Sequence, residues 1–239
     1  MQRIFSTIFY SFIALGAMCC SILSYANGFG INATRLVYPE RSKDISTTVR
    51  NTTDNVVYLV QAGISRAQDS MVSAPFTVTP PLFRLEPNSV NLIRITLNAT
   101  DLPKDRESVF YLHTSALPAS KKINNEQASD DIPAAIQFAV GNIIKVFYRP
   151  TNLLTTSEEA QKNLKFLVME NGLKVVNDSP YYVSLSSLTV GGKKIPLNTP
   201  EELMISPFSN HVYPMKNTAG VIEWKTINDI GGNNAYTSH

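Results

Sequence analysis

The sequence predicts an all-β protein built from two β-sandwich domains in series. From Gly30 onward, short runs rich in β-branched and aromatic residues alternate with turn residues, and this pattern stops at Arg149-Pro150 and restarts from Thr151. Proline cannot donate a hydrogen bond to a β-ladder, so Pro150 ends a sheet and indicates a hinge. We therefore expect one domain over residues 27–150 and a second over residues 151–239.

The first domain has the strand density of an immunoglobulin-like sandwich. Strands are expected near 31–38, 45–51, 56–64, 76–85, 90–97, 108–117 and 134–148. Turn residues separate them at 51–55, 86–89 and 102–105. Seven strands in about 120 residues is the immunoglobulin-like pattern. Residues 119–131 are polar and lack periodicity, which predicts a loop.

The second domain is smaller and follows the same pattern. Strands are expected near 164–169, 173–177, 181–190, 203–206, 210–215 and 220–225. A short helical turn is expected from Ser157 to Asn163. The tail after Gly232 is short, so the last strand of this domain is expected to be abbreviated.

The first 26 residues have the features of a secretory signal peptide. A basic start at Arg3 precedes an uncharged apolar run from Ile4 to Leu23, and Ser24-Tyr25-Ala26 supplies small residues at the −3 and −1 positions of a cleavage site. An uncleaved membrane anchor is the alternative, but no basic flank follows the run. Both cysteines lie inside this segment, so the mature chain is expected to form no disulfide and no thiolate metal site.

Composition and motifs disfavour an enzyme or a nucleic-acid-binding protein. The net charge is only +2, which leaves no basic footprint for a polyanion. The three histidines, His113, His211 and His239, share no metal-ligand spacing, and no phosphate-binding glycine loop or nucleophile elbow occurs. We expect no catalytic residue, no cofactor and no metal.

Two cations interrupt apolar rows and require an explanation. Arg35 alternates with Ile31, Ala33 and Val37, and Lys145 lies between Ile143 and Phe147. An unpaired charge buried on such a face costs several kcal/mol, of the order of 2–7 for a polar group and more for an ion. Each cation therefore either reaches water or an internal carboxylate, or both face a cleft and bind an external carboxylate.

The stretch "IPAAIQFAVGNIIKVFYRP" (132–150) contains a second ambiguous pattern. Ile136, Phe138 and Val140 fall on one face at period two. They either fill the core of their own domain or belong to an edge strand that is offered to another protein. An exposed apolar edge is an aggregation hazard, so a protein retains one only for use.

Five motifs in order give the chain a family resemblance. They are "TPPLFRLEP" (79–87), "LPKDRESVFYL" (102–112), "IIKVFYRP" (143–150), "NDSPYYVSL" (177–185) and "INDIGG" (227–232). With the signal peptide, they make the chain resemble the PapD-type periplasmic chaperones of chaperone–usher pili over nearly the whole mature sequence. The resemblance implies two immunoglobulin-like domains in a boomerang with a cleft between them.

The resemblance also implies roles for individual residues. Arg35 and Lys145 occupy the places of two cleft cations that anchor the C-terminal carboxylate of a pilin subunit in the family. Ile136, Phe138 and Val140 match the strand that completes the pilin sandwich by donor-strand complementation. The three charges that match a family trio joining the domains are Glu107, Arg149 and Asp229. The alternative is that these three are unrelated surface charges, which contribute little.

Two local features qualify the likeness. "TPP" at 79–81 matches a place where the family often has a cis proline, an isomer that sequence does not reveal. His113 stands where the family usually has Asn or Cys.

The implied function is that of a periplasmic chaperone that delivers pilin subunits to an outer-membrane usher. Self-capping through the exposed strand is an implied resting state, and neither nucleic-acid binding nor membrane insertion after signal cleavage is expected. A secreted β-sandwich that binds a ligand or acts as an adhesin is the rival hypothesis. A β-sandwich hydrolase is a more remote one, because no catalytic triad or metal spacing occurs.

Overall fold

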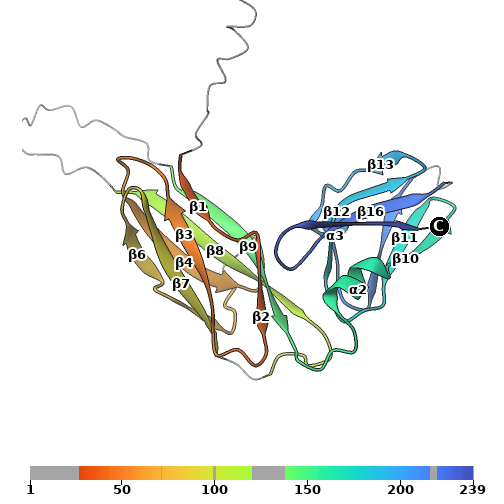
Figure 1. Cartoon of the computed structure of the whole chain (residues 1–239), viewed down its shortest axis with the longest axis horizontal. Helices are drawn as coiled ribbons and strands as arrows, with labels where there is room; N and C mark the ends of the chain where they lie inside the picture. The colour runs from red at the N-terminus through yellow and green to blue at the C-terminus, as the bar shows by residue number, and fades with distance from the viewer. Residues whose placement is uncertain (1–26, 71, 99–100, 120–137, 216–219, 239) are drawn as a thin grey trace, which may run out of the picture.

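The computed structural model is a nearly all-β molecule made of two sandwiches that meet at an angle (Figure 1). It describes residues 27–70, 72–98, 101–119, 138–215 and 220–238. The expected signal peptide, residues 1–26, lies outside this range, as do residues 120–131 of the expected loop. No helix in the described ranges is long and apolar enough to cross a membrane.

The first sandwich packs a four-stranded sheet against a five-stranded one. The first sheet has the order β1 (Phe29–Ile31), β3 (Ile45–Asn51), β7 (Ser89–Leu97), β5 (Phe76–Thr79). The second has the order β2 (Arg35–Pro39), β9 (Val140–Arg149), β8 (Ser108–Pro118), β4 (Tyr58–Ser65), β6 (Leu82–Leu85). The β2–β9 pair is parallel and the others are antiparallel. Alternate residues of both sheets, such as Val49, Ile93 and Leu112, form a fully buried core.

The second sandwich is smaller and has its own core. One sheet has the order β10 (Lys165–Met169), β11 (Gly172–Asn177), β15 (Ser209–Pro214). The other has the order β13 (Lys193–Ile195), β12 (Val183–Val190), β16 (Ile222–Ile227), β17 (Asn233–Ser238), and β14 (Met204–Ile205) also pairs with β12. Leu173, Val183, Leu188 and Tyr213 have no exposed surface between these sheets.

Two strands that the sequence predicts as single units are each divided between the two sheets. The expected strand 31–38 becomes β1 and β2, because the chain leaves one sheet after Ile31 and enters the other at Arg35. The expected strand 76–85 becomes β5 and β6 in the same way, and the Thr79–Pro80 bond between them is cis. The core-facing positions change parity at the second crossing, from Phe76 and Val78 to Leu85, as expected where a chain moves from one sheet to the other.

The expected strand 134–148 begins later than predicted. β9 starts at Val140, where it pairs with Ala116, and its partner β8 ends two residues beyond at Pro118. Phe138 and Ala139 therefore lie outside the strand, and residues 134–137 lie outside the described residues. β8 therefore continues past the point where its pairing with β9 stops.

The second sandwich has two strands that the prediction missed. Gly191 and Gly192 adopt positive φ angles of 53° and 78°, and the tight turn they form returns the chain as β13. The tail forms β17, a six-residue strand fully paired with β16, so the expectation of an abbreviated last strand is wrong. Main-chain pairing with β16 stabilises a segment whose side chains alternate only weakly.

The expected helical turn is confirmed as α2 (Ser157–Lys162). Thr156 accepts a hydrogen bond from the Glu159 amide, and the Glu159 carboxylate accepts one from the Thr156 amide, which is a capping box. The helix buries Gln161, whose side-chain and main-chain oxygens accept hydrogen bonds from Thr226 and Trp224 of β16. A similar capping box at Thr199 begins α3 (Pro200–Leu203).

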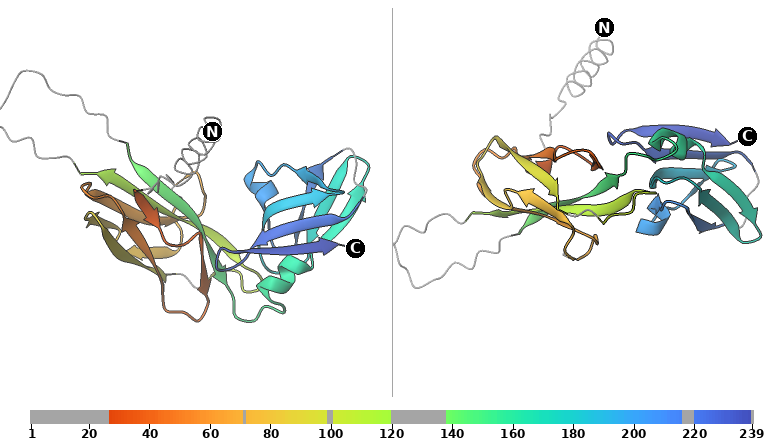
Figure 2. Two further views of the ribbon diagram at one scale, coloured as in Figure 1. Left: turned by 45° about the horizontal axis from the view of Figure 1, so that its top comes forward. Right: turned by 90° about the horizontal axis from the view of Figure 1, so that it is seen from below.

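Further views show how the two sandwiches approach one another (Figure 2). The turn that joins β16 to β17 reaches toward the start of β2. The Arg35 guanidinium donates to the Ile227 main-chain oxygen at 2.9 Å there. On the other side of the junction, the Glu107 amide donates to the Pro180 oxygen at 2.9 Å. The two domains are therefore joined by specific contacts as well as by the chain at Pro150.

Candidate functional site

Arg35 and Lys145 lie side by side on one face of the five-stranded sheet. The parallel pairing of β2 with β9 puts Arg35 in register with Lys145, and the antiparallel pairing of β8 with β9 puts Tyr111 opposite Lys145. Residues in register on adjacent strands project to the same face. The sheet thus brings together two cations and a phenol that are far apart in the sequence.

This face forms one wall of a pocket of about 430 Å³ between the two sandwiches. Thr34 and Ile143 line it beside the two cations and Tyr111 on the first-domain side. The second domain contributes the opposite wall through Asn198, Pro200, Leu203 and Ile227. Both domains therefore shape the space in front of the cations.

Neither cation has a carboxylate partner within 4.0 Å among the residues that the structure describes. Arg35 packs over the Phe147 ring at 5.4 Å, and its Nε atom is buried without a hydrogen-bond partner in the described structure. Burial lowers the pKa of Arg35, and the negative charges of Asp229 and Glu107 offset this only in part. The site carries positive charge that these contacts leave uncompensated.

Lys145, like Arg35, is partly buried and lacks a carboxylate partner among the described residues. Burial lowers the pKa of Lys145, and the positive charge of Arg35 lowers it further. Two partly desolvated cations on one surface repel each other, so an anion between them is the group that they favour. A carboxylate fits best, because an arginine fork and a lysine point charge can both donate to its two oxygens.

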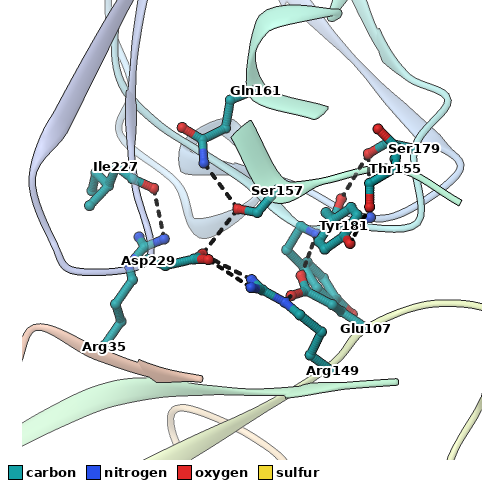
Figure 3. Close-up of polar contacts among 11 residues, drawn as sticks. Arg35, Glu107, Arg149, Thr155, Ser157, Gln161, Ser179, Tyr181, Ile227 and Asp229 are labelled. Carbon is teal, nitrogen blue, oxygen red and sulfur yellow. Dashed lines mark hydrogen bonds and ion pairs between the residues drawn. The ribbon is translucent and has the colours of Figure 1, made fainter. Parts of the chain in front are cut away.

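A second charged cluster lies at the hinge, and its charges are paired (Figure 3). Arg149 Nε lies 2.7 Å from Glu107 Oε1, and its two terminal nitrogens lie 2.6 and 2.9 Å from the Asp229 oxygens. Glu107 also accepts a hydrogen bond from the Tyr182 amide at 2.9 Å. Asp229 also accepts one from the Ser157 hydroxyl at 3.0 Å. The arginine comes from the first domain, and the partners come from both.

The pKa values of these groups follow from burial and pairing. Burial raises the pKa of Glu107, whose side chain is only 2% exposed, and Arg149 and the Tyr182 amide counteract this only in part. Burial is the largest single influence on Asp229 and by itself would raise its pKa, but the hydrogen bonds and charge of Arg149, with smaller contributions from Ser157 and Arg35, together lower the pKa below its ordinary value. For Arg149, burial acts to lower the pKa, and the two carboxylates together raise it.

The three residues expected on a donated strand are placed differently from one another. Val140 is the first residue of β9 and is 43% exposed, whereas Phe138 precedes the strand and is 76% exposed. Ile136 lies outside the described residues. The two residues that are described therefore do not fill the core of their own domain, which was one of the two alternatives.

Several residues that sequence reasoning missed take part in these sites. The Ile227 oxygen holds Arg35, the Tyr182 amide holds Glu107, and Ser157 links Asp229 to Gln161. Main-chain donors and acceptors leave no trace in the type of side chain, so only Ser157, at the start of the expected helical turn, carried a usable signal.

A larger pocket of about 550 Å³ lies at the hinge but is a weaker candidate. It is lined by apolar residues such as Leu153, Leu154 and Phe208. Of its acidic groups, Asp178 is paired with Lys165 at 2.6 Å, and Asp105 is paired with Arg106 at 2.7 Å. Within the described ranges, no group of three or more His, Cys, Asp or Glu residues could hold a metal ion.

Comparison with known proteins places the chain in a family. Residues 28–154 match the model of the PapD N-terminal domain of pili and flagellar-assembly chaperones, and residues 159–238 match the PapD C-terminal domain of pili assembly chaperones. The chain belongs to this family of pilus-assembly chaperones.

Individual relatives agree with this assignment. The probable fimbrial chaperone protein ElfD of Escherichia coli O157:H7 is 36% identical over 206 residues, which cover 85% of this chain and 83% of ElfD. The structure of the Salmonella enterica SafB chaperone in complex with the SafA pilin is 30% identical, with a TM-score of 0.74, and covers 90% of this chain and 97% of that one. The structure of the periplasmic chaperone SfaE is 31% identical, with a TM-score of 0.70, and the match covers 87% of this chain and 99% of SfaE.

Proposed function

We propose that this protein is a periplasmic chaperone that binds pilin subunits by donor-strand complementation and delivers them to an outer-membrane usher. The observation that carries the proposal is the pair Arg35 and Lys145. The two cations share one face of a cleft wall and have no carboxylate partner among the described residues. SafB, which this chain resembles, is bound to a pilin.

In this proposal the pair anchors the C-terminal carboxylate of the subunit. The carboxylate supplies the negative charge that the partly buried cations lack, and each hydrogen bond to a charged group contributes about 1.5–3 kcal/mol. No nucleotide or cofactor takes part in the proposed cycle, because binding energy drives capture and exchange of the donated strand drives release.

The apolar row Ile136, Phe138 and Val140 supplies the donated side chains in this proposal. β2 pairs with β9 only from Lys145 to Arg149, so the β9 edge from Val140 to Ile144 has no β2 partner to hydrogen-bond. A subunit strand added there gains main-chain hydrogen bonds. Each apolar side chain contributes roughly 1.5–3 kcal/mol if it becomes fully buried. In the free protein, a second copy is the proposed cover for this edge.

The trio Glu107, Arg149 and Asp229 keeps the two domains in one arrangement in this proposal. The domain boundary falls after Pro150, with the first domain from residue 27 and the second from residue 151. The expected signal peptide and the likeness to SfaE, a periplasmic chaperone, support the proposed periplasmic localisation.

The decisive experiment is co-purification of a pilin subunit from the periplasm with the tagged protein. The wild type should retain one subunit per chaperone, and Lys145→Ala should retain little while remaining folded. Lys165→Ala is the matched control, because the Lys165 side chain is 68% exposed and pairs with Asp178 away from the cleft. Failure of folded wild type to retain any subunit would contradict the proposal and favour a secreted ligand-binding or adhesin-like β-sandwich.

The donated strand is tested separately from the anchor. Phe138→Asp should lower subunit yield, because it puts a charge into the groove that the apolar row fills. Val90→Asp, which replaces another exposed apolar residue on β7, should leave the yield unchanged. An undiminished yield with Phe138→Asp would show that this side chain is not donated.

A further inference from the structure

The turn between β16 and β17 reaches from the second domain to the anchor of the first. The Ile227 oxygen, at the end of β16, accepts a hydrogen bond from Arg35 Nη1 at 2.9 Å. Two residues later, Asp229 pairs with Arg149 through two hydrogen bonds. The guanidinium of Arg35 is therefore held by a main-chain atom of the opposite domain (Figure 3).

The turn itself is closed by its own hydrogen bonds. The Asn228 amide donates to the Gly232 oxygen at 2.8 Å, and the Gly231 amide donates to the Asn228 oxygen at 3.0 Å. The Asn228 side-chain oxygen accepts from the Gly232 amide at 2.8 Å. Gly231 has a φ of 86°, a conformation that residues with a side chain rarely adopt. These hydrogen bonds hold the turn in a conformation that requires the positive φ of Gly231.

Gly231 also makes the close contact between this turn and the first domain. A Cβ atom at position 231 would overlap Thr34 Oγ1, whereas the Thr34 Cβ and Cγ2 atoms would lie at ordinary distances of 3.5 and 3.8 Å. Thr34 immediately precedes Arg35 and lines the same pocket. A side chain at 231 must therefore either turn the Thr34 side chain out of its present χ1 rotamer, which a β-branched residue resists, or move the turn away from the start of β2.

We propose that Gly231 is a positioning residue for the subunit anchor. Its lack of a side chain lets the turn rest on Thr34, which puts the Ile227 oxygen where it fixes the Arg35 guanidinium beside Lys145. The second domain thereby orients a binding group of the first. This inference rests on the proposed function, because it assigns a role at the proposed carboxylate site.

The physical reason is preorganisation. A free arginine side chain samples many rotamers and loses that freedom when it binds a ligand. Arg35 loses it beforehand, because one terminal nitrogen is tied to Ile227. Withdrawal of that acceptor should weaken carboxylate binding and leave contacts along the donated strand unchanged.

The test measures preference for a free carboxylate. The probes are two synthetic peptides with the C-terminal strand sequence of the subunit that the wild type captures, one with a free carboxylate and one amidated. The wild type should prefer the free acid by roughly ten- to a hundredfold, the equivalent of one hydrogen bond to a charged group. Gly231→Ala should reduce this preference toward equal binding, with the affinity for the amide unchanged.

A second substitution at Thr34 distinguishes a positioning role of Gly231 from a general loss of binding in Gly231→Ala. Thr34→Ala removes the atom that the new Cβ would strike, so the double variant Gly231→Ala/Thr34→Ala should regain the preference. Thr34→Val keeps an atom at both γ positions and a restricted χ1, so Gly231→Ala/Thr34→Val should not. Both doubles retain the same backbone strain at residue 231, which therefore cancels in the comparison.

Thr34→Ile provides a second variant if Gly231→Ala does not fold. It enlarges the same contact from the exposed, first-domain side without strain at Gly231, and it should also lower the preference for the free acid. A full preference in folded Gly231→Ala or in Thr34→Ile would overturn the inference, and so would equal behaviour of the two double variants. No preference in the wild type would overturn the anchor itself, and this inference with it.

Discussion

Lys145 and Arg149 lie four residues apart on the same strand, yet their charges have opposite fates. Arg149 meets two carboxylates at 2.6–2.9 Å, one of them on the second domain. Lys145 meets none among the described residues, and its nearest charged neighbour in the sheet is another cation, Arg35. The paired cation joins the two domains, and the partly desolvated cation without a partner is the one that we propose binds a subunit.

The largest effect on stability is expected from a substitution that removes Arg149 from its ion pairs with Glu107 and Asp229. Arg149→Met should lower the free energy of unfolding by about 3–5 kcal/mol, because it leaves the buried Glu107 carboxylate without its cation. Denaturant unfolding measures the loss. Addition of Glu107→Gln to the same chain should restore part of it, and a loss below about 1 kcal/mol would put the cluster in the class of weak surface pairs.

The same substitution at the unpaired site should leave the fold intact. Lys145→Met removes a partly desolvated charge, so the free energy of unfolding should stay the same or rise. Affinity for the subunit should fall by about 1.5–3 kcal/mol, the value of a hydrogen bond to a charged group. Titration calorimetry and unfolding of the same preparation measure both quantities. A large loss of stability would mean that Lys145 has an internal partner.

A smaller effect, with a characteristic pH dependence, is expected at Asp229. Asp229→Asn should lower stability by about 1–2 kcal/mol at neutral pH, less than a buried partner would, because the side chain is 39% exposed and solvent screens the pair. The pKa of Asp229 is lower in the folded state, so its contribution is complete above the unfolded pKa of about 3.9 and is lost as the pH falls through the folded pKa.

The contribution of Glu107 to the free energy of unfolding should have the opposite dependence on pH. Burial raises its folded pKa, so ionisation costs stability, and this cost disappears as the pH falls through that raised pKa. Unfolding curves of wild type, Asp229→Asn and Glu107→Gln between neutral and acidic pH measure both dependences. Parallel pH profiles for the two variants would contradict the assignment of different environments to the two carboxylates.

The smallest effect is expected where distance alone suggests a strong pair. Lys165 and Asp178 lie 2.6 Å apart, as close as Arg149 and Asp229, but their side chains are 68% and 58% exposed. Lys165→Met should change the free energy of unfolding by less than about 0.5 kcal/mol. A larger change would mean that distance, and not burial, governs these ion pairs.

Prediction from sequence succeeded where the signal was local. Alternating apolar residues and turn residues identified two β-sandwiches, and the helical turn expected from Ser157 to Asn163 is α2. Prediction failed where the signal depended on a distant partner. The sheet crossings at 32–34 and at Pro80-Pro81, the late start of β9 and the strand β17 all depend on which segment pairs with which.

The sequence by itself determined that Arg35 and Lys145 interrupt apolar rows, and it contained the motif "INDIGG" (227–232) that includes Gly231. Tertiary structure decided that the parallel pairing of β2 and β9 sets the two cations in register, and that the second domain touches one of them through a main-chain oxygen. The physical reason is that the apolar neighbours of a charged residue along the chain already indicate that burial of its charge is costly. Its compensation depends on atoms that only the folded chain brings near.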